Sequence, residues 1–201
     1  MIRALFLAGL GAFVATVALA APAAAPPPRD DMALGRDKAP VTVVEYASVG
    51  CPHCAQFAIE EFPAFKTKYI DSGKVRFVLR EMLTGDTTLA AAGFITARCA
   101  GPAKYFQVVD GVYRAQAEIV SGGEALQPLL MVAKAAGLTE DQVTACLHDD
   151  AKVNAMQARE ARAEADGVDG TPTFMINGKR YEGEHTAAAL GAAVVAARRR
   201  R

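Results

Sequence analysis

The sequence has no excess of charge of either sign. Its 22 lysine and arginine residues balance 22 aspartate and glutamate residues over 201 positions. Because nucleic-acid-binding proteins usually carry a basic patch, the composition gives no reason to expect nucleic acid as a partner. We find no internal repeat. Apolar residues make up 52% of the chain, which suits one globular domain with a core of its own.

Cysteine and histidine are also scarce, with four and three residues. Cys51 and Cys54 form a Cys-x-x-Cys pair, which is typical of redox sites and of half of a structural zinc site. A zinc site needs two more ligands at metal spacing, and Cys99 and Cys146 lie far away in the sequence. No methionine or histidine cluster surrounds the pair. Redox chemistry is therefore favoured, and copper or zinc binding through Cys51, Cys54 and His53 stays open as an alternative.

The cysteine pair lies at a predicted junction between a strand and a helix. Residues 41–46 are apolar and β-branched, which predicts a buried strand, and helical spacing follows Cys54. Cys51 is then expected at the exposed helix N-terminus, with Cys54 one turn further on. Pro52 suits the first helical turn, because its missing N–H would have no partner there.

The predicted position of Cys51 favours its thiolate. Unpaired backbone N–H groups and the positive end of the helix dipole face this sulfur. The pKa of a free thiol is about 8.5, and in Cys-x-x-Cys sites it falls to roughly 3.5–7. The dipole alone does not supply the whole shift, so we expect hydrogen bonds from the Cys54 thiol, from backbone N–H groups and from His53. A stabilised thiolate makes the corresponding disulfide a stronger oxidant.

The N-terminal segment has the pattern of a secretory signal peptide. A short cationic start is followed by the apolar run 4–20, with a small-x-small cleavage signal that ends at Ala20. Cleavage after Ala23 is nearly as good, and an uncleaved membrane anchor is the alternative. No cysteine follows the run, so a lipoprotein anchor would have no attachment point. Export implies an oxidising compartment, in which disulfides persist.

The rest of the chain changes its pattern twice. A helix over residues 52–69 and an alternating strand over 75–81 complete a β-α-β unit with an expected parallel crossover. A block without strand signals follows, and strands resume at residues 170–176, where Asn177-Gly178 predicts a hairpin turn. A helix over residues 185–198 ends the pattern. The block is expected to contain helices over residues 88–100, 103–116, 123–137, 139–148 and 151–166.

These features resemble the exported DsbA-like thiol oxidoreductases. The resemblance rests on Cys51-Pro-His-Cys54 after a strand, on the helical block, and on the segment Gly170-Thr-Pro-Thr-Phe-x-Ile-Asn-Gly-Lys-Arg-Tyr181. It implies an α/β, thioredoxin-like fold with an inserted all-helical domain. The expected organisation is a signal peptide (1–20), a disordered leader (21–33), the first part of the thioredoxin domain (34–84), the helical insertion (85–166) and the second part of the thioredoxin domain (167–201).

The resemblance also assigns roles to residues. Cys51 matches the nucleophilic cysteine of the family, Cys54 matches its resolving partner, and Pro52-His53 matches the dipeptide of the strongly oxidising members. After the second strand the family often continues Arg-Glu-aromatic-Pro, whereas this chain continues Arg80-Glu81-Met82-Leu83. This departure affects only the expected path into the insertion.

Two further positions match the family near the cysteine pair. Pro172 matches the proline whose preceding bond is cis, which would place the backbone of Thr171 beside the disulfide, free to pair with an extended substrate. Glu45 matches the buried acid below the active site. It shares a strand face with Val41 and Val43, and a buried carboxyl has a raised pKa and can carry protons for Cys54.

Cys99 and Cys146 both fall in the helical block. An even number of cysteines in an exported protein indicates a second, structural disulfide. It would close a loop of about 47 residues, worth nominally about 4 kcal/mol in the chain-entropy model. Two buried reduced thiols are the alternative. We expect His148 and His185 to lie on the surface.

The predicted activity is the oxidation of substrate dithiols by the Cys51–Cys54 disulfide through a mixed disulfide. The substrates would be unfolded or reduced exported proteins, and no bound cofactor or metal is needed. The resemblance implies reoxidation by a membrane quinone-linked protein that is DsbB-like. From the signal-peptide pattern we expect a periplasmic or otherwise exported location, and we expect a monomer. A disulfide isomerase or reductase is the alternative within redox chemistry.

Overall fold

The computed structural model describes residues 30–121 and 126–200. The predicted signal peptide, with its cleavage site near Ala20, lies outside the described residues, and so does most of the predicted leader. Within the two described ranges, no helix combines the length and the apolar character that crossing a bilayer requires.

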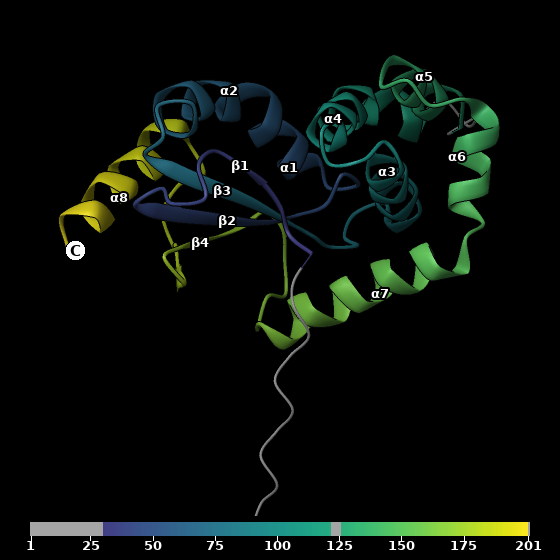
Figure 1. The fold of residues 1–201 in the computed structure, drawn as a ribbon. Helices are drawn as coiled ribbons and strands as arrows, with labels where there is room; N and C mark the ends of the chain where they lie inside the picture. The colour runs from purple at the N-terminus through teal and green to yellow at the C-terminus, as the bar shows by residue number, and fades with distance from the viewer. Residues whose placement is uncertain (1–29, 122–125, 201) are drawn as a thin grey trace, which may run out of the picture. The chain divides into compact units, whose positions relative to one another are not determined.

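A five-stranded mixed sheet carries the active-site segment (Figure 1). The strand order is β1-β3-β2-β4-β5, with β2 and β3 parallel and all other pairs antiparallel. β2 has the predicted apolar, β-branched pattern and β3 the predicted alternating pattern, and most residues of both strands are buried. The strands are β1 (Met32–Leu34), β2 (Val41–Ala47), β3 (Val75–Glu81), β4 (Thr173–Ile176) and β5 (Lys179–Arg180).

The edge strand β1 corrects the prediction for the leader. Residues 21–33 were expected to be disordered, yet Met32 and Ala33 lie in a strand that pairs antiparallel with β3, in register with Leu79 and Val78. Just before it, the carboxylate of Asp31 accepts hydrogen bonds from the guanidinium of Arg80. The ordered part of the chain therefore begins before residue 34, because β3 offers a free edge that the last two residues of the expected leader help to cover.

The helical run that follows Cys51 is not one regular α-helix. It consists of α1 (Pro52–Gln56), the π-helical turn η1 (Phe57–Glu61), α2 (Phe62–Phe65) and a second π-helical turn, η2 (Lys66–Ile70). Pro63 lies at the start of α2. A proline has no N–H to donate and its ring clashes with the carbonyl group four residues earlier. A π-turn beside it relieves this clash by widening the helix locally.

Five helices form the predicted insertion, which lies at one end of the sheet in Figure 1. Their bounds agree with the predicted helices to within a few residues, apart from a longer second helix. They are α3 (Thr87–Cys99), α4 (Tyr105–Ser121), α5 (Leu126–Ala135), α6 (Glu140–Leu147) and α7 (Asp150–Ala165). The last of them runs back from the insertion to the sheet, which the chain re-enters at β4.

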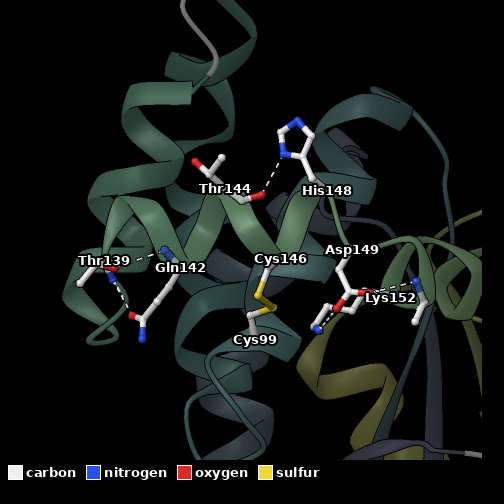
Figure 2. Close-up of a disulfide and its surroundings, with 9 residues drawn as sticks. Cys99, Thr139, Gln142, Thr144, Cys146, His148, Asp149 and Lys152 are labelled. Carbon is white, nitrogen blue, oxygen red and sulfur yellow. Dashed lines mark hydrogen bonds and ion pairs between the residues drawn. A yellow bond between two sulfur atoms is a disulfide. The ribbon is translucent and has the colours of Figure 1, made fainter.

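A disulfide ties the insertion together (Figure 2). Cys99, the last residue of α3, is bonded to Cys146 on α6, with their Cα atoms 6.5 Å apart. Thr139 and Gln142 form a capping box that starts α6, as Thr139-x-x-Gln142 predicts. The predicted second disulfide is therefore present, on a helix whose start is fixed by its own sequence.

Glu81, at the end of β3, holds the sheet and the insertion together. Its carboxylate is completely buried and accepts hydrogen bonds from Arg98 Nε on α3 and from Tyr105 OH on α4, each at 2.7 Å. Arg159 on α7 donates to the other carboxylate oxygen. Three helices of the insertion are thereby anchored to one strand end. These contacts come directly before Met82-Leu83, where the sequence departs from the family pattern.

The two faces of the sheet are covered differently. Val41, Val43 and Glu45 of β2 face the large core below the active-site helical run and α8 (Ala187–Arg199). Val44 and Tyr46 face a smaller cluster, which includes residues from the end of α7 and the segment after it. The hairpin between β4 and β5 has the predicted Asn177-Gly178 turn, and both residues have positive φ, as a type I′ turn requires.

Candidate active site

A short loop, residues 48–50, places Cys51 after the end of β2 and is held by hydrogen bonds within itself, from the start of α3 and from α4. The backbone N–H of Cys51 donates to the carbonyl oxygen of Ser48 at 3.1 Å, and the N–H of Asp86 donates to the carbonyl oxygen of Gly50 at 3.0 Å. A Cβ atom at Gly50 would lie 2.1 Å from the carbonyl oxygen of Asp86, so only glycine fits there. From the insertion, Gln116 Nε2 donates to the carbonyl oxygen of Val49 at 2.7 Å.

The two thiols of the pair differ in burial. Cys51 is the N-cap of α1 in an extended conformation, and Pro52 occupies the first helical turn, as predicted. Cys54 is completely buried. Pro52 and His53, the neighbours of Cys51, are exposed. Cys51 was expected at an exposed helix N-terminus, but it is only 7% exposed. The reason is the close approach of Thr171, whose carbonyl oxygen lies 3.5 Å from Cys51 Sγ.

The surroundings of Cys51 favour its thiolate. A hydrogen bond from the Cys54 thiol is the largest cause that lowers the pKa of Cys51, from 9.0 to about 5. Burial opposes the shift, while the side chain of Thr171 and the backbone N–H groups of Cys54 and His53 contribute to it. Four pKa units correspond to about 5 kcal/mol in favour of the thiolate. His53 therefore contributes to the shift through its backbone N–H, and Thr171 adds a side-chain donor that the sequence did not indicate.

Cys54 and Glu45 are shifted in the opposite direction. Burial is the largest cause that raises the pKa of the Cys54 thiol far above its ordinary value, with the hydrogen bond to Cys51 and the charge of Glu45 adding to it. Glu45 is 4% exposed, and its burial, with the charge of Cys51 added, raises its pKa from 4.5 to about 8. The predicted burial of Glu45 is confirmed. At neutral pH the site thus combines one thiolate, one thiol and one protonated carboxyl group.

The bond between Thr171 and Pro172 is cis, as expected, and lies beside Cys51. The hydroxyl of Thr171 shares a hydrogen bond with that of Thr84, which precedes α3, and Thr84 N–H donates to Ser48 Oγ. The loops before and after the insertion therefore meet at the cysteine pair. No local sequence pattern indicates Thr84 or Gln116, because their partners lie 87 and 67 residues away.

A groove of about 410 Å³ opens beside Pro172. Polar residues line it, from the helical run after Cys51 on one side and from the start of α8 on the other. His185, predicted on the surface, is exposed but borders this groove, and partial burial lowers its pKa. The lining residues are His53, Gln56, Phe57, Glu60, Glu61, Thr171, Pro172, His185 and Thr186.

The other cysteines are not available as zinc ligands, because Cys99 and Cys146 are bonded to each other. In residues 30–121 and 126–200, no group of three or more histidine, cysteine, aspartate or glutamate side chains is arranged to hold a metal ion.

Comparison with known proteins agrees with this geometry. A family model described as thioredoxin matches residues 28–196, which is most of the chain. The chain belongs to the thioredoxin family. A Rickettsia typhi relative in this family, which carries the provisional name protein-disulfide oxidoreductase, is 35% identical over 155 residues. The match covers 76% of this chain but only 57% of the relative, so the chain spans little more than half the length of that protein.

Solved structures show the same fold. The crystal structure of alpha-DsbA1 from Wolbachia pipientis is 23% identical, with a TM-score of 0.78 over 87% of this chain and 94% of that chain. Oxidised BdbD from Bacillus subtilis is 19% identical, with a TM-score of 0.74 over 84% of this chain and 93% of that chain. The predicted fold, a thioredoxin domain with a helical insertion, and its resemblance to DsbA proteins are confirmed.

Proposed function

We propose that this thioredoxin-family protein is a thiol:disulfide oxidoreductase that donates the Cys51–Cys54 disulfide to reduced proteins. The observation that carries the proposal is the asymmetry of the pair. The pKa of Cys51 is lowered to about 5 and that of Cys54 is raised by burial. A stabilised thiolate favours the reduced pair, which makes the disulfide an oxidant.

In the proposed reaction, a substrate thiolate attacks Cys51 Sγ, and the S–S bond to Cys54 breaks. Cys54 leaves with the bonding electron pair and takes up a proton, for which the protonated carboxyl group of Glu45 is the nearby source. A second substrate thiolate then attacks the substrate sulfur of the mixed disulfide and expels Cys51 as a thiolate. The substrate loses two electrons and its two thiol protons, and the pair gains the two electrons.

The groove beside Pro172 would hold the substrate. The backbone of Thr171 lies next to Cys51, where it is free to pair with an extended chain. An unfolded or reduced protein offers such a chain, so we propose exported proteins during folding as substrates. Export is supported by the N-terminal sequence pattern and by the Cys99–Cys146 disulfide, which is typical of oxidising compartments. We further propose that the protein acts as a monomer and is reoxidised by a DsbB-like, quinone-linked membrane protein.

The test is the oxidative refolding of reduced ribonuclease by the oxidised protein, followed by thiol counting and recovered ribonuclease activity. We expect stoichiometric loss of substrate thiols, with two new thiols on Cys51 and Cys54. Cys51→Ala should abolish the transfer. Cys54→Ala should not oxidise reduced ribonuclease, because it cannot form the Cys51–Cys54 disulfide. When it is mixed with disulfide-bonded ribonuclease instead, its Cys51 thiolate should attack a substrate disulfide, expel one substrate thiolate and remain in a covalent mixed disulfide, because the variant lacks the resolving thiol.

The matched control is the double variant Cys99→Ala/Cys146→Ala, which removes the other cysteine pair and should retain the transfer. Equal activity of the Cys51→Ala variant and the wild type would rule out the proposed site. Reduction of insulin without oxidation of ribonuclease would instead assign the protein to the reductases or isomerases.

A further inference from the structure

A second pocket lies on the other side of the active-site helical run from the groove at Pro172. Its walls come from β1, β2 and β3, from the helical run, and from α4 of the insertion. Its volume is about 320 Å³, and its lining is predominantly apolar, with Phe62, Phe77, Leu79 and Val109 among the wall residues. None of its lining residues belongs to the groove at Pro172. It is therefore a separate site between the thioredoxin domain and the insertion.

Two residues of the pocket walls each carry a buried polar atom without a partner. Glu45 from β2 and Tyr113 from α4 both line it, and each residue is only 4% exposed. Among the described residues, neither Glu45 Oε1 nor the Tyr113 hydroxyl has a hydrogen-bond partner. Buried polar groups in folded proteins are almost always paired, so each exception requires a physical reason.

The distribution of these atoms points to a ligand rather than to imperfect packing. Three buried side-chain atoms without a partner are found in the described residues, and two of them belong to residues that line this pocket. The third, Thr96 Oγ1, belongs to α3 and does not line it. An apolar pocket with a few convergent polar groups is the usual form of a small-molecule site.

We propose that this pocket binds a small uncharged molecule that has an apolar body and one hydroxyl group, with the hydroxyl lying between Glu45 and Tyr113. A hydroxyl can donate one hydrogen bond and accept another, so it can satisfy both groups at once. Burial excludes a charged head group that has no opposite charge beside it. Lys66 and Asp110, which also line the pocket, carry opposite charges and select for neither sign.

The size of the pocket favours a substituted ring. A dry apolar cavity of roughly 150 Å³ holds benzene, and this pocket has about twice that volume. A phenol with a short alkyl chain would place its hydroxyl against the polar atoms and its ring and chain against the apolar walls. The proposal concerns binding alone and does not depend on the oxidoreductase activity.

The test uses para-propylphenol and propylbenzene, which differ by one hydroxyl, in a nuclear magnetic resonance titration of the wild-type chain. We expect para-propylphenol to bind about tenfold more tightly, the effect of one buried hydrogen-bonded group. Its ring should show proximity to the side chains of Leu79 and Val109 rather than to Thr171 and Pro172.

Tyr113→Phe removes one of the two polar atoms and keeps the shape of the wall. Because the lost hydroxyl has no partner in the chain, the variant should fold with at least the thermal stability of the wild type. It should bind para-propylphenol several-fold more weakly and propylbenzene equally well. Tyr69→Phe is the matched control, since Tyr69 lies outside this pocket, and it should bind both probes as the wild type does.

Three results would overturn the proposal. The first is equal affinity of the wild type for the two probes, which would leave only an apolar cavity. The second is a Tyr113→Phe variant that binds para-propylphenol as tightly as the wild type does. The third is the absence of binding, or binding that maps to the groove at Pro172.

Discussion

Glu81 and Glu45 are both buried on neighbouring strands, but one lies at the junction with the insertion and the other at the active site, and their roles differ. Glu81 ends β3 with its carboxylate surrounded by Arg98, Tyr105 and Arg159. Glu45 lies inside β2 with one oxygen atom that has no partner among the described residues, and burial raises its pKa to about 8. The first carboxylate holds three helices to the sheet, and the second is an acid that can exchange a proton near neutral pH.

The two cysteine pairs repeat the contrast. Cys99 and Cys146 are bonded and join two helices of the insertion. Cys51 and Cys54 are free thiols with pKa values shifted in opposite directions. In the insertion, Cys99 and Cys146 are bonded to each other, and at the junction with the sheet Glu81 is paired with its hydrogen-bond donors. These bonds stabilise the fold. At the active site, hydrogen bonds stabilise the Cys51 thiolate, whereas burial raises the pKa values of Cys54 and Glu45, and these opposite shifts make the site reactive.

The largest expected effect comes from breaking the junction at Glu81. Glu81→Gln removes the negative charge between two arginines whose side chains are 16% and 10% exposed. Removal of one partner from a buried ion pair typically costs 3–5 kcal/mol, and we expect a loss in that range. Urea unfolding of the wild type and the variant measures it. A loss below about 1 kcal/mol would place this cluster with ordinary surface pairs.

The disulfide of the insertion should have the next largest effect. The double variant Cys99→Ala/Cys146→Ala opens a loop between residues that are 47 positions apart. The chain-entropy model gives about 4 kcal/mol as an upper value for this loss of stability. Urea unfolding without reductant, with Cys51 and Cys54 replaced by alanine in both proteins, isolates the effect. Unchanged stability would mean that the bond does not constrain the unfolded chain.

Glu45→Gln should have the opposite sign from Glu81→Gln. The pKa of Glu45 is raised from 4.5 in the unfolded chain to about 8 in the fold. Its contribution to stability is therefore complete below pH 4.5 and is lost as the pH rises to about 8. Near neutral pH the wild type has lost about 3 kcal/mol in this way. The glutamine variant cannot ionise, so it should be more stable than the wild type by about that amount.

The difference in unfolding free energy between the wild type and Glu45→Gln, measured against pH on the reduced proteins, tests this sign. Because both proteins contain Cys51, its own titration cancels to first order. The difference should be near zero below pH 4.5 and should grow up to about pH 8. A variant that is less stable than the wild type at every pH would show that the carboxyl group has a partner, and the contrast with Glu81 would fail.

Thr171→Val is expected to have the smallest effect. It removes the side-chain hydrogen bond that helps to lower the pKa of Cys51 and keeps the cis bond to Pro172 in place. One hydrogen bond is worth about 1 kcal/mol, or slightly less than one pKa unit. The rate of Cys51 alkylation against pH reports the shift, with Thr173→Val as a control on the neighbouring strand. An unchanged midpoint would leave the Thr171 hydroxyl without a role at the sulfur.

The sequence predicted the parts of this molecule that local patterns determine. The strand before Cys51, the Thr139–Gln142 capping box and the Asn177-Gly178 turn each depend on residues within a few positions of one another. The cysteine motif, the helical block and the segment 170–181 together carried the resemblance to a family, and this resemblance predicted the fold and located Glu45 and Pro172. Local chemistry and two matched motifs were sufficient for these features.

The features that the sequence did not predict depend on contacts between distant residues. β1 is too short to show a strand pattern and forms because β3 offers it an edge. Glu81 reads as an ordinary strand residue until Arg98 and Arg159 reach it from 17 and 78 positions away. The π-helical turns around Pro63 and the burial of Cys51 by Thr171 likewise depend on packing that no local window contains.

The most direct test of the account is the ultraviolet titration of the thiolate in the reduced protein, with Cys54→Ala and Cys51→Ala as references. The central claim is that the chain stabilises one thiolate and suppresses the other. The account predicts one thiolate that appears with a midpoint at about pH 5. It should be absent in Cys51→Ala, and in Cys54→Ala the midpoint should move upward because the main hydrogen-bond donor is lost. A wild-type midpoint near the ordinary cysteine value of 9.0 would contradict it.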